Sequence, residues 1–330
     1  HLIIGFVSIE SNSIKVNAIN DHFIQHCKSV INLHKSDTQL MISIGGGNND
    51  NGFHSTALTP GNRKQFANSA INTLLKYGLD GLDIDWEFPG WATVHYNDKN
   101  TFNLLLKEVK QTFREYSVRS HTKDLVLSVA VAAQYTIIDR SYSAPQLNQY
   151  VDFINLMAYD YYLFHWYLPV VGHNSPLSSR SSRIPLFTTF STQWSANHWH
   201  QLGVHKSKIM VGIPTYGRSF RLAFRSFTSP GSLAKSSSQD MSYSQICQFL
   251  DTKGTTVAFD EESGVPYAFR DNTWITYESK ESALKKSTWI RDNGFGGVMT
   301  FSLNADDLTG QCHHNHSFPI HHAINSVAKQ

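Results

Sequence analysis

Short apolar runs alternate with amphipathic helical patterns along this chain of 330 residues. Each run is nearly continuous in apolar residues and is bounded by turn residues, so it reads as a buried strand. The runs are LIIGFVSI, QLMISIGGG, LDGLDIDWEF, LVLSVAVAA, FINLMAYD, KIMVGIPTYG and GGVMTFSL. Such strands, with helices between most of them, are typical of a parallel sheet that is covered on both faces. The pattern therefore predicts an α/β fold, and we favour a (β/α)8 TIM barrel.

An open doubly wound sheet is the alternative arrangement of the same elements. That fold commonly carries a G-x-G-x-x-G turn that opens a helix directly after an early strand. The glycines of SIGGG (43–47) are not followed by a helix in that register. The helix that follows is expected over residues 60–77, with Thr59 as its N-cap, Pro60 in its first turn and Gly78 after its end.

The alternation stops between about residues 221 and 272. This stretch contains Ser- and Gly-rich loops, a short helical pattern in YSQICQFL and two strand patterns, TTVAFD and VPYAF. We interpret it as a small α+β insertion that precedes the last barrel strand. The expected organisation is a barrel formed by residues 1–220 and 273–330, with an insertion domain over residues 221–272.

One predicted strand carries a row of acids, in the sequence LDGLDIDWEF (79–88). Alternate residues of a strand face the same way, so Asp83, Asp85 and Glu87 share one face. Burial and mutual repulsion both raise carboxyl pKa values, so at least one of the three is expected to keep a proton near neutral pH. A carboxyl group that keeps its proton at neutral pH is what a general acid requires.

The position of the row within the fold favours catalysis. Glu87 ends the strand, and the carboxyl ends of barrel strands form the active-site face. A single Asp at a strand end would read as a helix cap, but three acids in alternation do not. Such clusters also suit Mg²⁺ or Ca²⁺; however, the other strand ends offer Tyr, Arg and Ser. We therefore expect no metal and no cofactor.

Composition excludes some classes of partner. Hydrophobic residues make up 41% and charged residues 16% of the chain, which indicates a globular protein. The net charge is +2 without a basic block, so no nucleic-acid partner is expected. No apolar run is long enough for a membrane helix. One N-glycosylation sequon begins at Asn315, and the three cysteines, Cys27, Cys247 and Cys312, allow at most one intramolecular disulfide.

The acid row and its surroundings resemble glycoside hydrolase family 18. DGLDIDWE matches the D-x-x-D-x-D-x-E signature of that family's chitinases, LMISIGG looks like its S-x-G-G strand, and FINLMAYD looks like its M-x-Y-D strand. Three further segments, GHNSPL, VGIPTYGRSF and GGVMTFSLNADDLTGQC, resemble the animal chitinases and chitinase-like lectins. The likeness runs along the whole chain in order. It implies a disulfide between Cys247 and Cys312.

The resemblance implies roles for individual residues. Glu87 would protonate the glycosidic oxygen, the substrate's own 2-acetamido oxygen would attack the anomeric carbon, and Asp85 would orient the acetamido N–H. Asp83 would hold or share the proton that lets Asp85 turn. Tyr159 would donate a hydrogen bond to the acetamido oxygen. The other residues implied to line the substrate cleft are Phe6, Trp86, Met157, Asp160, Tyr216, Arg218 and Phe301.

The sequence also departs from the family pattern. The strand that usually precedes the equivalent of HLIIGFV is not in this chain. Gly47 and Phe301 stand where the family usually has Trp, which predicts weaker stacking on sugar rings. We expect a secreted, monomeric, endochitinase-like enzyme of reduced activity whose partner is chitin or a chitooligosaccharide. The alternative is a chitinase-like lectin that binds chitooligosaccharides with weak or no hydrolysis.

Overall fold

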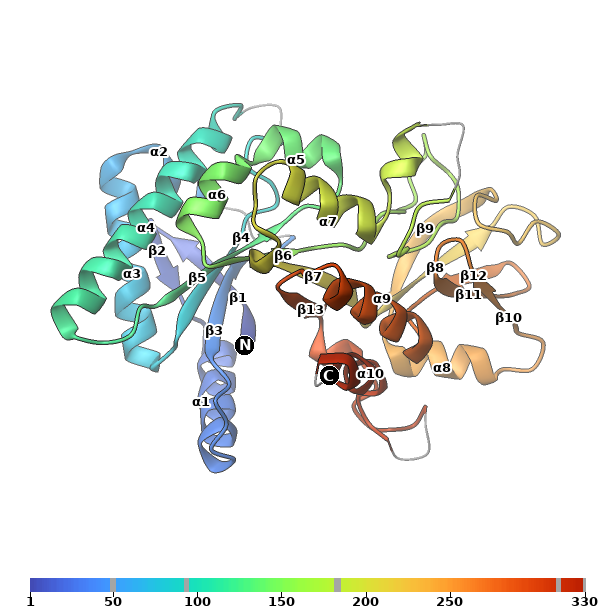
Figure 1. Ribbon diagram of the computed structural model, residues 1–330. Coiled ribbons are helices and arrows are strands. Elements are labelled where there is room, and N and C mark those ends of the chain that lie inside the picture. The colour runs from blue at the N-terminus through green and yellow to red at the C-terminus, as the bar shows by residue number, and fades with distance from the viewer. Residues whose placement is uncertain (48–51, 92–94, 181–184, 313–315, 329–330) are drawn as a thin grey trace. The chain divides into compact units, whose positions relative to one another are not determined.

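The computed structural model describes residues 1–47, 52–91, 95–180, 185–312 and 316–328 (Figure 1). Asn315 of the sequon lies outside these residues. The chain forms two compact units. The first comprises His1–Asn155 and Leu202–Lys208, and the second comprises Leu156–Gln201 and Ile209–Gln330.

The first unit is an alternation of strands and helices, as the apolar pattern predicts. Its elements in chain order are β1 (Leu2–Glu10), β2 (Ser13–Lys15), α1 (Ala18–Leu33), β3 (Leu40–Gly45), α2 (Phe53–Leu58), α3 (Pro60–Tyr77), β4 (Gly81–Asp85), α4 (Asp98–Ser120), β5 (Val126–Val131), α5 (Tyr135–Ser141), α6 (Ala144–Tyr150) and the start of β6 (Phe153–Leu156).

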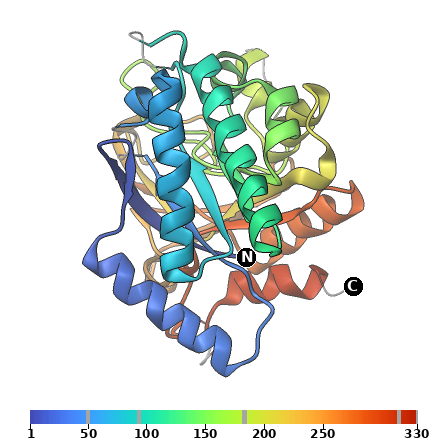
Figure 2. The same ribbon diagram turned by 90° about the vertical axis from the view of Figure 1, so that its left-hand side faces the viewer.

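The strands of the first unit form a parallel sheet. β3 pairs with β1 on one side and with β4 on the other, and β4 pairs with β5, all in parallel. β6 follows as the neighbour of β5, while β2 turns back antiparallel to the end of β1. Every residue of β3 and β4 is buried. Figure 2 shows α3 and α4 side by side in front of these strands, which explains why β3 and β4 lack a polar, solvent-facing alternation.

Helix α3 has the boundaries that its sequence predicts. The Thr59 side chain accepts a hydrogen bond from the N–H of Asn62 (3.2 Å), and Pro60 occupies the first turn, where its missing N–H costs nothing. Gly78 ends the helix at φ 58°, in the left-handed region that favours glycine. The helix therefore stops in time for the chain to enter β4.

The second unit contains the remaining elements. They are, after the end of β6, α7 (Thr192–Gln201), β7 (Ile209–Pro214), β8 (Gly217–Leu222), β9 (Ala234–Met241), α8 (Tyr243–Asp251), β10 (Thr256–Asp260), β11 (Val265–Arg270), β12 (Thr273–Thr276), α9 (Lys280–Asp292), β13 (Gly297–Phe301) and α10 (Pro319–Ala328).

The strands of this unit belong to two different sheets. β7 and β13 pair in parallel, as barrel strands do. The other strands form an antiparallel sheet in the order β10-β11-β12-β8-β9. Most of β8 and all of β12 lie outside the predicted insertion, residues 221–272, so the antiparallel sheet extends beyond both predicted boundaries. The division into barrel and insertion domain stays a prediction.

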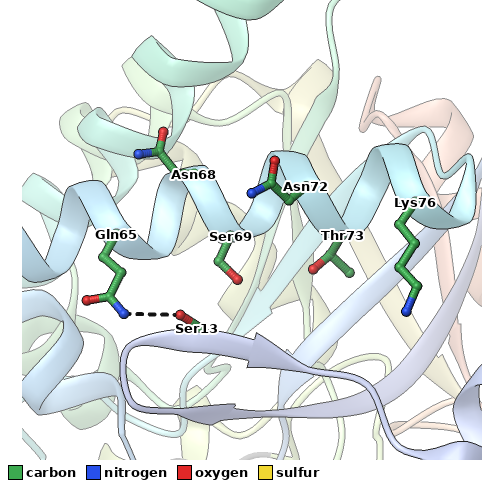
Figure 3. A pocket seen from close by; sticks show the side chains of 7 residues that line it. All are labelled: Ser13, Gln65, Asn68, Ser69, Asn72, Thr73 and Lys76. Atoms are coloured by element: carbon green, nitrogen blue, oxygen red, sulfur yellow. Dashed lines mark hydrogen bonds between the residues drawn. The ribbon is translucent and has the colours of Figure 1, made fainter.

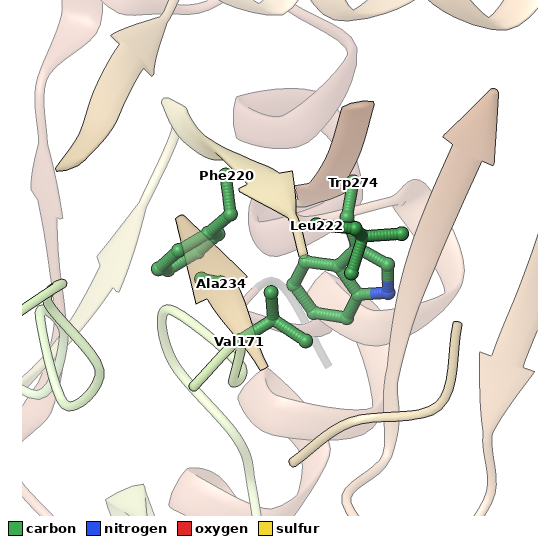
Figure 4. Packing of buried hydrophobic residues seen from close by; sticks show 5 residues of the cluster. All are labelled: Val171, Phe220, Leu222, Ala234 and Trp274. Atoms are coloured by element: carbon green, nitrogen blue, oxygen red, sulfur yellow. The ribbon is translucent and has the colours of Figure 1, made fainter. Parts of the chain in front are cut away.

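A compact apolar cluster holds the antiparallel sheet together (Figure 4). Trp274 is fully buried, and its ring lies 5.8 Å from that of Phe220 on the neighbouring strand. Its indole N–H donates to the carbonyl of Thr228 (2.9 Å), so burial leaves this polar group satisfied. The cluster consists of Val171, Phe220, Leu222, Ala234 and Trp274.

The cysteines agree with the implied pairing. Cys247 and Cys312 form a disulfide across a sequence separation of 65 residues, which confirms that prediction. Cys27 is a buried free thiol on α1. Within the described ranges, none of the helices combines the length and the apolar character that crossing a bilayer requires.

Candidate active site

Asp83 lies on β4 and is fixed by three hydrogen bonds from neighbouring strands. The Ser43 hydroxyl of β3 donates to Oδ2 (2.7 Å), while the Ser128 hydroxyl of β5 and the Asn155 amide of β6 donate to Oδ1 (2.6 and 3.0 Å). Burial raises the pKa of Asp83, and these three donors oppose that rise because they stabilise the ionised form. These donors therefore fix the orientation of the Asp83 carboxyl group and offset part of the rise in its pKa.

Asp85, two residues further on the same face, has a different environment. Its side chain is buried, and Oδ1 accepts no hydrogen bond from any described residue. Burial, then the charges of Glu87 and Asp83, raise the pKa of Asp85 well above its usual value. A carboxyl group whose buried Oδ1 has no donor among the described residues and which has two acidic neighbours keeps a proton more readily than Asp83 does. The proton expected in this row is therefore best placed on Asp85.

Glu87 is half-buried and lies just beyond the end of β4. The chain after β3 passes beside Glu87, because a Cβ added at Gly47 would lie 3.4 Å from Oε1 of Glu87. The Tyr142 phenol is part of the same environment: its pKa is raised well above the usual value by burial and then by the charges of Asp85 and Glu87. Nothing in the sequence around Tyr142 marked it as a neighbour of these acids.

The glycines of SIGGG allow β3 to approach the acid row closely. A Cβ at Gly45, where φ is 105°, would lie 2.0 Å from the backbone oxygen of Asp85. The N–H of Gly46 instead donates to that oxygen (2.9 Å). Gly46 also lies against the half-buried ring of Phe6, because a Cβ there would be 3.0 Å from the ring. Glycine is required at Gly45 because no other residue fits.

Trp86 does not lie where the predicted substrate contact requires it. Only 3% of the residue is exposed, and its ring stacks on Phe53 (5.2 Å between centroids) and meets Phe102 edge-on (5.6 Å). The reason is the strand alternation itself, which turns Trp86 away from the face shared by Asp85 and Glu87. Trp86 is a core residue of the first unit, so its burial gives no support to the predicted substrate contact.

In the second unit, Asp160 gathers two of the predicted binding residues. Its Oδ1 accepts from the Tyr216 hydroxyl (2.6 Å) and from Nε of Arg218 (2.7 Å). Arg218 also pairs with Asp240 on the adjacent strand β9 (2.5 Å). Burial and the Asp160 charge raise the pKa of Tyr216 well above its usual value, so its hydroxyl stays a donor at neutral pH. Asp160 has φ 59°, a conformation that Asp tolerates better than most residues.

Three aromatic rings of the second unit pack beside this group. Tyr159 stacks on Phe301 (5.9 Å between centroids, 18° between planes), and Tyr216 meets both rings edge-on (6.0 and 6.3 Å). Phe301 remains 41% exposed, so one side of its ring is open to solvent, and Met157 is half-buried. The second unit thus brings together five predicted binding residues from distant parts of the sequence, namely Tyr159, Asp160, Tyr216, Arg218 and Phe301.

A separate polar hollow on the first unit does not have the chemistry of a hydrolytic site (Figure 3). It encloses about 410 Å³ between the β2 turn and α3. Its lining offers hydroxyls, carboxamides and one ammonium but no carboxylate, so it lacks the carboxyl groups on which most glycosidases depend. The lining residues are Ser13, Gln65, Asn68, Ser69, Asn72, Thr73 and Lys76. Among all described residues, no group of three or more His, Cys, Asp and Glu side chains is placed to hold a metal ion.

A family model described as "Glycosyl hydrolases family 18" matches residues 1–306. The chain belongs to this family. It is 30% identical to mouse chitotriosidase-1 over 97% of this chain and 70% of that protein. The fold prediction is confirmed as well, because solved structures of the family superimpose over the whole chain and show a TIM barrel with an insertion domain.

Solved relatives include both a chitinase and a pseudo-chitinase. A chitinase from Trichuris suis, titled an immunomodulatory active chitinase, has a TM-score of 0.92 at 29% identity and covers 99% of this chain and 90% of its own. Human YKL-39, titled a pseudo-chitinase with retained chitooligosaccharide binding properties, has a TM-score of 0.92 at 30% identity and covers 100% and 91%. Similarity alone therefore leaves activity open, and the residues of this chain have to decide it.

Proposed function

We propose that this protein is a chitinase that hydrolyses β-1,4 linkages between N-acetylglucosamine units, with Glu87 as the general acid and base. The observation that carries the proposal is the difference between Asp83 and Asp85. Burial raises the pKa of both carboxyl groups. Three donors oppose that rise at Asp83, whereas at Asp85 the charges of Glu87 and Asp83 add to it and Oδ1 accepts no hydrogen bond from the described residues. A lectin has no need for a buried acid row, since burying like charges together lowers stability.

The proposed reaction uses the substrate's own amide. Glu87 donates its proton to the glycosidic oxygen while the 2-acetamido oxygen attacks the anomeric carbon, which breaks the glycosidic bond and forms an oxazolinium ring. Water then attacks the same carbon, Glu87 takes the water's proton, and the ring opens to the free sugar. Both steps proceed with inversion, so the β configuration is retained, as in enzymes with a protein nucleophile.

Asp85 has the polar atom that this chemistry needs. Its unoccupied Oδ1 is an acceptor for the acetamido N–H once the side chain turns toward the substrate. The proton shared along the row can then lie between Asp83 and Asp85, where the three donors to Asp83 already support charge. This assigns the resting proton to Asp85, whereas Asp83 was the residue first expected to hold or share it.

We assign saccharide binding to residues of both units, each on its own contacts. In the second unit, Tyr159 would donate to the acetamido oxygen, the Asp160–Tyr216–Arg218 group would bind polar substituents, and Phe301 and Met157 would contact ring faces. In the first unit, Phe6 is the remaining aromatic candidate. The partner is chitin or a chitooligosaccharide, no metal or cofactor takes part, and the protein acts as a secreted monomer.

A lectin that binds chitooligosaccharides without cutting them is the second candidate. Gly47 favours it, because the chain beside Glu87 presents no side chain there to stack on a sugar. Loss of one stacking contact weakens binding by about tenfold. The missing stacking contact does not remove the proton of Glu87, so we expect reduced affinity for the substrate rather than an inactive site.

Hydrolysis of a fluorogenic chitotrioside by the wild-type protein and by Glu87→Gln tests the proposal. We expect the wild type to release the fluorophore and Glu87→Gln to lose at least about 100-fold in kcat, which is the usual contribution of a general acid. Both proteins should bind chitotetraose with similar affinity. Equal, near-zero rates with retained binding would establish the lectin instead.

A further inference from the structure

Two exposed aromatic rings and an arginine form a cluster on the connection that follows the acid row. The guanidinium carbon of Arg140 lies 5.6 Å from the centroid of the Trp91 ring and 5.5 Å from that of Tyr96. Trp91 is 41% exposed and Tyr96 is 72% exposed. Trp86, only five residues before Trp91, is by contrast sealed in the core. Both rings thus pack against Arg140 and still keep surface open to solvent.

The cluster is held in place by the backbone around it. Nε of Arg140, at the end of α5, donates to the carbonyl of Gly90 (2.9 Å), and the N–H of Trp91 donates to the carbonyl of Phe88 (3.2 Å). Lys99 of α4 donates to the carbonyl of Asp139 on α5 (2.8 Å), which ties the two helices together. The residues from Glu87 to Trp91 therefore form one braced turn rather than a loose loop.

This geometry suits the apolar face of a pyranose ring. Indole and phenol rings present flat apolar surfaces, and the arginine covers one side of each at a cation–π distance, which leaves ring surface for a ligand. Within the described residues, Nε is the only nitrogen of Arg140 seen to donate a hydrogen bond, so its terminal nitrogens are available to hydroxyl or acetamido oxygens. A neutral saccharide matches both features.

We infer that Trp91, with Arg140 and Tyr96, forms a stacking subsite for a β-linked N-acetylglucosamine unit next to the turn that carries Glu87. The inference rests on the proposed function, since it takes the ligand to be the chain on which Glu87 acts. Trp91 lies four residues from Glu87 on the braced turn, and Gly47 beside Glu87 offers no ring. In this protein the aromatic contact of the first unit thus comes from the connection after β4.

Calorimetric binding of N-acetylglucosamine oligomers of three to six units tests the inference. The Glu87→Gln background prevents turnover during titration. Trp91→Ala and Arg140→Ala are compared with Trp91→Phe, which keeps a smaller ring, and with Phe23→Ala, which removes another exposed aromatic of the first unit on α1. Thermal melting of each variant verifies that it is folded.

We expect Trp91→Ala to weaken binding of the hexamer by about five- to tenfold, the value of one aromatic contact. Trp91→Phe should restore part of that loss, Arg140→Ala should lose about threefold in affinity, and Phe23→Ala should have the affinity of the Glu87→Gln parent.

The outcomes separate this inference from the proposed function. If folded Trp91→Ala binds every oligomer with unchanged affinity while wild-type hydrolysis still depends on Glu87, this inference alone is overturned. Loss of binding in Trp91→Ala with no hydrolysis by the wild type would support the subsite and overturn the proposed activity. No binding of any oligomer would overturn both.

Discussion

Asp83 and Asp85 lie two residues apart on one strand, but only Asp83 is surrounded by donors. Three hydrogen bonds from β3, β5 and β6 reach Asp83, while Oδ1 of Asp85 receives none from the described residues. Since donors favour an ionised carboxyl group, Asp83 loses its proton more easily than Asp85 before any ligand binds. The proposed chemistry depends on this difference, because one acid must stay charged while its neighbour keeps a proton.

Removing one donor to Asp83 should change the pH dependence of hydrolysis. Ser128→Ala deletes the 2.6 Å bond to Oδ1, which raises the pKa of Asp83 and thus the lower apparent pKa of the acid pair. We expect the acid limb of kcat/KM to move to higher pH and the maximum to fall by about tenfold. Ser117→Ala, which removes another buried serine of the first unit, should leave the limb where it is. If folded Ser128→Ala shows the same acid limb of kcat/KM as the wild type, Asp83 does not take part in the reaction.

The raised pKa of Asp85 should cost stability at neutral pH. Between about pH 4 and the raised native value, the unfolded chain is ionised and the native residue keeps its proton, so stability falls as pH rises through this window. Asp85→Asn removes the penalty without changing the shape of the side chain. We expect the melting temperature of Asp85→Asn to lie about 1–3 °C above that of the wild type at pH 7. Near pH 4 the two melting temperatures should be equal. Asp37→Asn, a change at an exposed acid, should show no such difference.

A buried ion pair holds α9 to the rest of the second unit. Lys286 and Glu278 are fully or almost fully buried and paired, and Lys286 Nζ also donates to the Ser175 hydroxyl (2.7 Å). Burial lowers the pKa of Lys286 and raises that of Glu278, and each charge opposes the shift of the other. Lys286→Met should lower the free energy of unfolding by about 3–5 kcal/mol, because it leaves Glu278 unpaired.

The matched double variant distinguishes pairing from packing at this site. Lys286→Met combined with Glu278→Gln removes both charges, so urea denaturation should recover much of the loss. If the double variant is as unstable as the sum of the two single variants, the charges do not interact in the way that we describe.

The disulfide should contribute substantially to the second unit. It closes a loop of 65 residues, for which chain entropy predicts about 4 kcal/mol. Cys312→Ser should therefore lower the midpoint of urea unfolding, and a reducing agent should lower that of the wild type to the same value. The reducing agent should have no effect on Cys312→Ser, since Cys27 is already a free thiol. A reductant effect on that variant would contradict this assignment.

Strand alternation alone predicts that Asp83, Asp85 and Glu87 share one face. The same alternation turns Trp86 to the opposite side of the strand, toward the core, whereas the resemblance implies a substrate contact for it. Ser128 and Asn155 could not be found in this way. They lie inside apolar runs, on strands far along the chain, and only the sheet brings them to Asp83. The disulfide was likewise implied by resemblance rather than by spacing.

The exposed aromatic cluster shows the same limit. Arg140 is distant from Trp91 and Tyr96 in sequence, and each of the three is an ordinary residue type in its own segment. Their meeting depends on the end of α5 reaching the turn after β4. Such contacts follow from tertiary packing, which no local periodicity encodes.

Time-resolved proton NMR of N-acetylglucosamine tetramer cleavage, with the fully deacetylated tetramer in parallel, tests the central claim most directly. A substrate whose own amide attacks must release the β-anomer first, and without the acetyl group it has no nucleophile. We predict that the β-anomer appears before mutarotation and that the deacetylated tetramer stays intact. Initial release of the α-anomer, equal cleavage of the deacetylated tetramer, or no cleavage of either would contradict the account.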